Sequence, residues 1–389
     1  KRCAFVFEYT AVDCGLMPVA LLKKIYNAAA GAGANKSINK VVLSNGSILQ
    51  TYDAEAPTVA TTVGCVELQS GATATVQDLH HSGYIAINNL EGDADSTLKL
   101  VKNAKATHAG IFVLGDMAAT VSEYSFAGTI ELSQATVNDA STRDVTLQLN
   151  HSSIAENAVI SLASTLGSGA RLGLGINVES ATIAGLTSAN SVGTRAIVYS
   201  GTMRPDADWN ITKPNNNNKL IIDSAENATY TYYGQLQNVD ITKDGEGTQI
   251  FAGTSSDYSG AITVNKGVLQ FESNTLSMLN MASSVSVNQT GTVNLYVADD
   301  SVLSTAFSMN SGKLVLKDNQ SLTLTGAVDV EGRARWSSSR SNDNNNKWAT
   351  KGFNIGGTTT VKNDSTLSLL GNNRMQINDG GTLLLEDGA

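Results

Sequence analysis

Between Thr248 and Trp336 one short pattern of apolar residues occurs four times. The copies begin 23, 22 and 21 residues apart, at Ile262, Val285, Phe307 and Val328. Within each copy, apolar residues alternate with polar ones on both sides of an Asn or Gly. The two-residue alternation is the period of a half-buried strand. The Asn or Gly marks a bend, because these residues adopt a positive φ at low energetic cost. A unit this short cannot bury its own apolar face and must stack on its neighbours. The repeat therefore predicts an all-β solenoid.

A pattern of short Thr- and Val-rich runs separated by Gly and Asn also occurs on both sides of the four copies. It predicts strands at 83–88, 97–101, 110–115, 128–132, 144–149, 158–162 and 170–175 before them. After them it predicts strands at 358–361, 366–370, 375–378 and 381–385. We therefore expect one solenoid over residues 40–389, preceded by a cap over residues 1–39.

The predicted cap combines an apolar strand with a short amphipathic helix. Phe5 and Phe7 belong to the strand, and Leu22 and Ile25 lie on the apolar face of a helix that starts near Pro18. A solenoid exposes apolar side chains and unpaired backbone groups at its first layer, so we expect this segment to cover them. The alternative is a docking element for a neighbouring subunit.

At the other end, the strand with Leu383 and Leu385 is followed by neither a helix nor a charged cap. We expect the last layer to be open. An apolar strand at one end and an open layer at the other offer complementary edges, which suggests head-to-tail assembly of the chain with itself.

Two Asn-rich stretches, near 205–219 and 337–352, interrupt the strand pattern and predict inserted loops. Trp209 and Trp348 lie in these stretches, and with Tyr232 they are candidates for stacking against a glycan. The alternative for such aromatic residues is packing within the fold.

Charge and hydropathy limit the classes of partner that the sequence favours. The net charge is −9, so nothing favours binding to nucleic acid or to an anionic membrane surface. The sequence has no apolar run of about eighteen residues, and we expect no transmembrane helix. It begins at Lys1-Arg2 without Met, which suggests a trimmed product.

The three cysteines, Cys3, Cys14 and Cys65, fit no zinc or redox spacing. A disulfide between Cys3 and Cys14 with Cys65 buried and free, another pairing, or three unreactive thiols all agree with the sequence.

Candidate chemistry is sparse. The segment from Glu91 to Asp95 places Asp93 and Asp95 two residues apart, which suits either a calcium ion or an ordinary solvated turn. A catalytic face of a solenoid should carry several acids or bases at one phase of the repeat, and no such alignment is present. We therefore predict no catalytic residue, no cofactor and no metal.

The segment from Gly247 to Gln270 resembles the passenger-associated transport repeat of bacterial autotransporters. It contains a Gly-led strand, a second Gly, the Tyr258-Ser-Gly260 turn, the Ile-Thr-Val264 strand, Gly267 and a Leu strand. Ile262 stands where that family usually has Thr. A weaker echo runs from Tyr124 to Leu132. The resemblance implies a right-handed parallel β-helix that is secreted or displayed at the bacterial surface.

These observations together favour a non-enzymatic extracellular surface or matrix protein. It would be an adhesin or a structural subunit, with surface glycans, proteins or further copies of itself as partners. The alternative is a carbohydrate-active β-helix enzyme, a polysaccharide lyase or glycoside hydrolase, and it rests on fold analogy alone.

Overall fold

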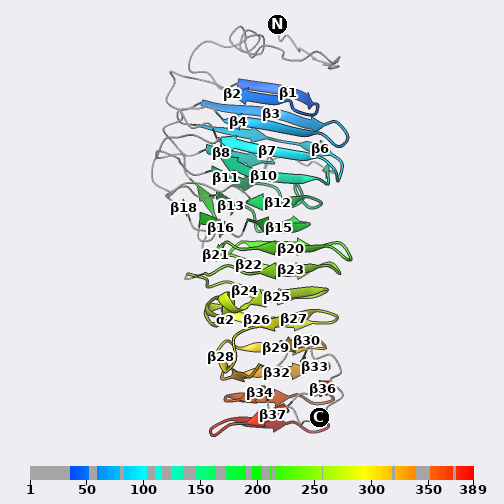
Figure 1. Cartoon of the computed structure of the whole chain (residues 1–389), viewed down its shortest axis with the longest axis vertical. Helices are drawn as coiled ribbons and strands as arrows, with labels where there is room; N and C mark the ends of the chain where they lie inside the picture. Colours follow the sequence, from blue (N-terminus) through cyan, green and yellow to red (C-terminus); the bar gives the residue numbers. More distant parts are fainter. Residues whose placement is uncertain are drawn as a thin grey trace. The chain divides into compact units, whose positions relative to one another are not determined.

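The computed structural model describes residues 36–51, 59–78, 83–102, 110–115, 124–134, 145–162, 172–189, 195–203, 211–212, 216–255, 257–317, 320–338, 351–370 and 374–389. The chain forms two compact units. Unit 1 comprises Lys1–Thr182 and Gly201–Pro214, and unit 2 comprises Ile183–Ser200 and Asn215–Ala389. Each is a stack of parallel strands (Figure 1).

Unit 1 contains two stacked parallel sheets. The first, S1, consists of β1 (Lys36–Leu43), β3 (Val59–Leu68), β5 (Gly83–Ile87), β8 (Gly110–Leu114), β11 (Val145–Leu149) and β13 (Leu172–Ile176), with β6 (Leu90–Gly92) and β9 (Ser125–Phe126) alongside. The second, S2, consists of β2 (Ile48–Thr51), β4 (Thr73–Asp78), β7 (Thr97–Lys102), β10 (Thr129–Gln134) and β12 (Val159–Leu162). A short antiparallel pair, β17 (Thr202–Met203) and β18 (Ile211–Thr212), also belongs to this unit.

Unit 2 is built mainly from three parallel sheets. Sheet S3 consists of β19 (Lys219–Asp223), β22 (Asp240–Asp244), β24 (Ala261–Val264), β26 (Ser284–Asn288), β29 (Phe307–Asn310), β32 (Val328–Glu331), β35 (Thr358–Val361) and β38 (Thr382–Leu385). Sheet S4 consists of β20 (Thr229–Tyr232), β23 (Thr248–Phe251), β25 (Val268–Glu272), β27 (Thr292–Tyr296), β30 (Lys313–Leu316), β33 (Arg333–Ser338) and β36 (Thr366–Leu370). Sheet S5 consists of β28 (Ser301–Leu303), β31 (Leu322–Leu324), β34 (Gly352–Ile355) and β37 (Arg374–Ile377).

Three more strands complete the description of unit 2 and its border. These are β15 (Gly185–Ser188), β16 (Ala196–Ser200) and β21 (Gln235–Gln237), of which β16 and β21 pair in parallel. The border between the units falls within β14 (Ser180–Ile183). All-β architecture, parallel pairing and stacking in layers confirm the predicted parallel β-helix in each unit.

The four sequence copies stack as the repeat predicted. Ile262 pairs with Val285, Val285 with Phe307 and Phe307 with Val328, so residues at one phase of the repeat lie directly above one another. All four side chains are buried and form one inward column of S3. The second half of each copy stacks in the same way in S4, from Leu269 through Val293 and Leu314 to Trp336.

The turns between the two halves correct the sequence interpretation in two copies. Gly267 and Gly332 have positive φ, at 59° and 66°, as expected. In the other two copies the left-handed residues are Gln289 and Ser311, at 45° and 65°. Gly291 is needed for a different reason: a Cβ there would collide with the carbonyl oxygen of Val264 in the preceding layer.

In the described part of unit 2, one helix interrupts the strands. After β25, a 3-10 turn (Ser273–Thr275) leads into α2 (Leu276–Met281), which occupies the position that β28 takes one layer later. The sequence does not predict α2, because six residues give no clear helical periodicity.

A ladder of side-chain amides follows the corner between S3 and S4. Asn288 donates through Nδ2 to Oδ1 of Asn265 at 3.0 Å, and Asn265 donates to Oδ2 of Asp244 at 3.4 Å. The direction of donation is set by Asp244, because a carboxylate can only accept. The ladder satisfies polar groups where the chain leaves one sheet for the next.

The predicted insertion near 337–352 leaves the stack in register. β33 ends at Ser338 and β34 begins at Gly352, yet Val328 still pairs with Thr359 across it. Of the other predicted insertion, the structure describes β18, residues 216–218 and the start of β19. Most of the predicted cap, including Phe5, Phe7, Leu22 and Ile25, lies outside the described residues.

Apolar side chains of the layer that contains β37 and β38 are partly exposed. Leu383 and Leu385 stack on the buried Thr359 and Val361, but Leu385 is itself 60% exposed and Leu383 is half-buried. Ile377 of β37, which stacks on the buried Ile355, is 49% exposed.

We predict that two neighbouring substitutions in one turn have opposite effects. Gln289→Gly should raise the free energy of unfolding by up to about 1 kcal/mol, because it relieves a left-handed conformation at an exposed position. Gly291→Ala should lower it by about 2 kcal/mol, since the new methyl group has no room. Denaturant unfolding of both variants measures this, and two equal losses would contradict our account of the turn.

Candidate functional site

The repeat-like segment uses its characteristic residues to build the stack. Cβ atoms at Gly253 and Gly260 would collide with the carbonyl oxygens of Gly234 and Val239 in the preceding layer. Tyr258 is buried and donates its hydroxyl to the carbonyl oxygen of Ala261 at 3.2 Å. Burial raises the pKa of Tyr258 well above its usual value. The motif is therefore a packing motif, and its residues point into the fold.

A lysine just before this segment occupies an inward position. Lys243 stacks between Ile222 and Val264 in a column that is otherwise apolar, and it is fully buried. Its ammonium group donates to the carbonyl oxygens of Asp244 and, at 2.8 Å, Gly245 in the corner turn. Burial lowers the pKa of Lys243 to about 8, although neighbouring carboxylates, Asp223 first, act in the opposite direction.

Two polar side chains of the same segment bind the backbone of other strands. Gln249 is buried; its Oε1 accepts from the amide of Leu186 at 3.1 Å, and its Nε2 donates to the carbonyl oxygen of Leu186 at 3.0 Å. Ser255 accepts through Oγ from the amide of Leu236 at 2.9 Å. Both side chains satisfy backbone groups at strand edges of β15 and β21.

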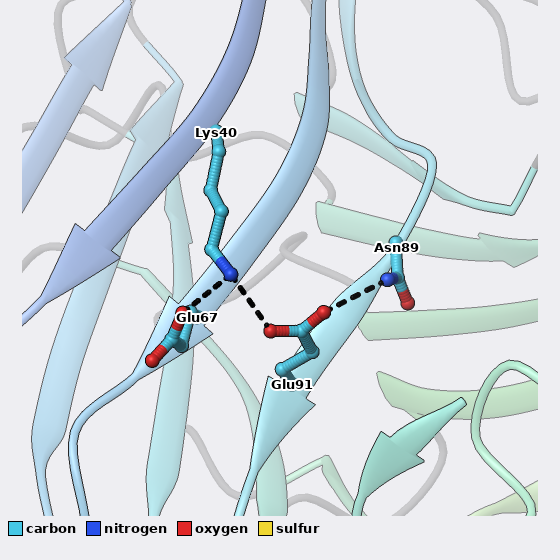
Figure 2. A network of polar contacts seen from close by, with 4 residues as sticks. All are labelled: Lys40, Glu67, Asn89 and Glu91. Carbon is cyan, nitrogen blue, oxygen red and sulfur yellow. Dashed lines mark hydrogen bonds and ion pairs between the residues drawn. The ribbon is translucent and has the colours of Figure 1, made fainter. Parts of the chain in front are cut away.

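The clearest charged cluster on the surface lies in unit 1, on β1, β3 and β6 (Figure 2). Lys40 contacts Glu67 at 2.5 Å and Glu91 at 3.0 Å, and Glu91 also accepts from Nδ2 of Asn89 at 3.2 Å. The bonds to Glu67 and Glu91 raise the pKa of Lys40. Because the three charged side chains are partly exposed, solvent screens the pairs and they contribute little stability.

The carboxylates of the candidate calcium segment have different partners. Glu91 binds Lys40, whereas Asp93 accepts from Ser70, from Ser96 at 2.7 Å and from the amide of Gly71 at 3.1 Å. These bonds, that from Ser70 first, lower the pKa of Asp93 to about 2. Asp93 thus ties its own turn to the turn of the preceding layer. Among the described residues, no three His, Cys, Asp or Glu side chains gather closely enough to hold a metal ion.

Cys65 is buried and forms no disulfide. Burial raises the pKa of its thiol to about 12, which leaves the thiol protonated and unreactive at neutral pH. Cys3 and Cys14 lie outside the described residues, so their predicted pairing stays a prediction.

Of the three glycan candidates, only Tyr232 falls in the described part of the chain. Its ring is fully buried against Phe251, with ring centroids 6.3 Å apart, and its hydroxyl donates to the carbonyl oxygen of Gln235 at 3.0 Å. The structure therefore contradicts a glycan contact at Tyr232, because a sugar at the surface cannot reach the ring. Trp209 and Trp348 lie outside the described residues.

Comparison with known proteins identifies the central segment. Residues 241–271 match the model of the passenger-associated-transport-repeat family. This match confirms the resemblance seen in the sequence, and the repeat belongs to passengers that are secreted or displayed at the cell surface. No curated protein and no solved structure matches the chain. No helix in the described residues is long and apolar enough to cross a membrane.

The polar contacts of Lys243, Gln249 and Lys40 were not predicted from the sequence. Lys243 and Gln249 could have been found by phase, because they stand where the next layer has Val264 and Leu269. The Lys40 cluster could not, since it joins residues 27 and 24 positions apart in a part of the chain whose repeat is irregular.

We predict that Lys243→Met makes the chain more stable at pH 7 and that this gain shrinks as the pH rises. The folded-state pKa of about 8 lies below the unfolded value of 10.5, so between these values the unfolded chain binds more protons and alkali favours folding. The difference between variant and wild type should fall by roughly 2.5 kcal/mol from pH 7 to pH 10.

Denaturant unfolding at several pH values measures this difference. Tyr and other Lys residues titrate in both proteins, so their contributions cancel in the comparison. A difference that does not change with pH would contradict the buried, destabilised ammonium.

Proposed function

We propose that this chain is the β-helical shaft of a bacterial passenger protein, located outside the cell, with a structural or adhesive role. The observation that carries the proposal is the passenger-associated repeat at 241–271. Its glycines, Tyr258 and apolar residues serve the stacking of layers, which suits a protein that extends a surface.

The partners we propose are surface glycans, surface proteins or further copies of the chain. Partnership with further copies of the chain would be lengthwise assembly through the backbone edges of stacked strands. Adhesion would use outward-facing residues and the insertions near 205–219 and 337–352, because changes there leave the inward columns intact.

The location is tested on intact cells of the producing organism. An antibody raised against the purified chain should label unpermeabilised cells or detect the chain in the medium. Protease added outside should remove the cell-bound signal while a cytoplasmic marker stays intact. A chain that becomes accessible only after lysis would overturn the proposed location.

The absence of enzymatic activity is tested separately. We expect the purified chain to release no products from a panel of acidic and neutral polysaccharides, with or without added calcium. Reproducible turnover, lost on heat unfolding, would replace our proposal with the carbohydrate-active alternative.

A further inference from the structure

The first strand of sheet S5 has two edges with different partners. One edge of β28 pairs with β31, and on that side the backbone amide of Thr325 donates to the carbonyl oxygen of Leu303 at 2.9 Å. Backbone groups of alternate residues point to opposite edges of a strand. The carbonyl of Val302 and the amide of Ser304 therefore face the other edge, towards α2.

The side chain of Asn280 satisfies both of these groups. Its Nδ2 donates to the carbonyl oxygen of Val302 at 3.1 Å, and its Oδ1 accepts from the amide of Ser304 at 2.7 Å. The hydroxyl of Ser304 adds a contact to the same oxygen at 3.0 Å. A neighbouring parallel strand makes the same pair of bonds, on either side of one residue, here Leu303. The carboxamide of Asn280 thus takes the place of a peptide group.

Helix α2 holds Asn280 against the strand. Met278 and Leu279 of the helix are buried, and Thr305 donates its hydroxyl to the carbonyl oxygen of Leu279. On the side of the preceding layer, Ser277 donates to the carbonyl oxygen of Ser255 at 3.4 Å. The helix is therefore fixed both to the layer before it and to the segment after β28.

The edge that Asn280 covers would otherwise invite pairing. Val302 is β-branched and 48% exposed, and an apolar strand with unpaired backbone groups is a template for strand addition. Gln249 and Ser255 bind strand edges in a similar way, but both are buried, whereas the bonds of Asn280 lie at the surface. We propose that Asn280 closes the edge of β28 against the addition of a strand from a second copy of this chain.

The test compares Asn280→Leu, which keeps the size and removes all three side-chain hydrogen bonds, with Asn294→Leu. Asn294 lies in β27, whose two edges are both paired, and its side-chain Nδ2 donates to Oε1 of Gln270 at 3.3 Å. We expect hydrogen exchange at the Ser304 amide to become roughly fivefold faster or more in Asn280→Leu alone. We also expect only this variant to gain mass with concentration in light scattering. The triple comparison with wild type separates edge closure from loss of an amide.

A second variant checks that strand addition causes the gain in mass. Val302→Lys, added to Asn280→Leu, should restore the wild-type mass, because a charge on an edge strand opposes pairing. If Asn280→Leu fails to fold, Asn280→Ser, which is small and polar, is measured in its place. Unchanged exchange at Ser304, or faster exchange without any gain in mass, would overturn the proposal.

Discussion

The close approach of one layer's backbone to the next is the constraint on which this structure depends. Parallel strands stack about 4.8 Å apart, and the corners that join them come as close as the strands do. At Gly253, Gly260 and Gly291 a Cβ would collide with a carbonyl oxygen of the preceding layer. These glycines therefore allow the close approach. Because the layers stack in register, apolar residues at one position of the repeat fall into the same inward column and bury one another.

The same constraint explains why polar side chains appear inside and at the borders of the stack. Every backbone group at a strand edge needs a partner, and a stack that changes its sheets cannot supply all of them from strands. In unit 2, Gln249, Ser255 and Asn280 provide the missing bonds to β15, β21 and β28. Lys243 acts similarly on the carbonyl groups of a corner, at the cost of burying an amine. These polar side chains near the passenger-associated repeat thus serve to satisfy the hydrogen bonds of backbone groups.

The sequence predicted what its local period determines. Strands expected at 97–101, 110–115, 366–370 and 381–385 correspond to β7, β8, β36 and β38, because two-residue alternation and Gly or Asn punctuation are local signals. It failed where a contact depends on register between distant layers. The partners of Lys40 and the burial of Tyr232 against Phe251 depend on other layers of the stack rather than on neighbours in sequence. The left-handed conformation of Gln289 also has no signal in its residue type.

Inward and outward positions of the repeat differ in how strictly the fold constrains them. The residues that the passenger-associated repeat specifies point inward or approach the backbone of the preceding layer, so the repeat pattern serves the stacking of layers. The outward positions obey no such rule: successive layers carry Thr263, Ser286, Ser308 and Asp329 at one outward phase of S3. Substitution there changes the surface without changing an inward column. The proposed shaft could therefore change its outward surface while its inward columns, and with them its fold, stay the same.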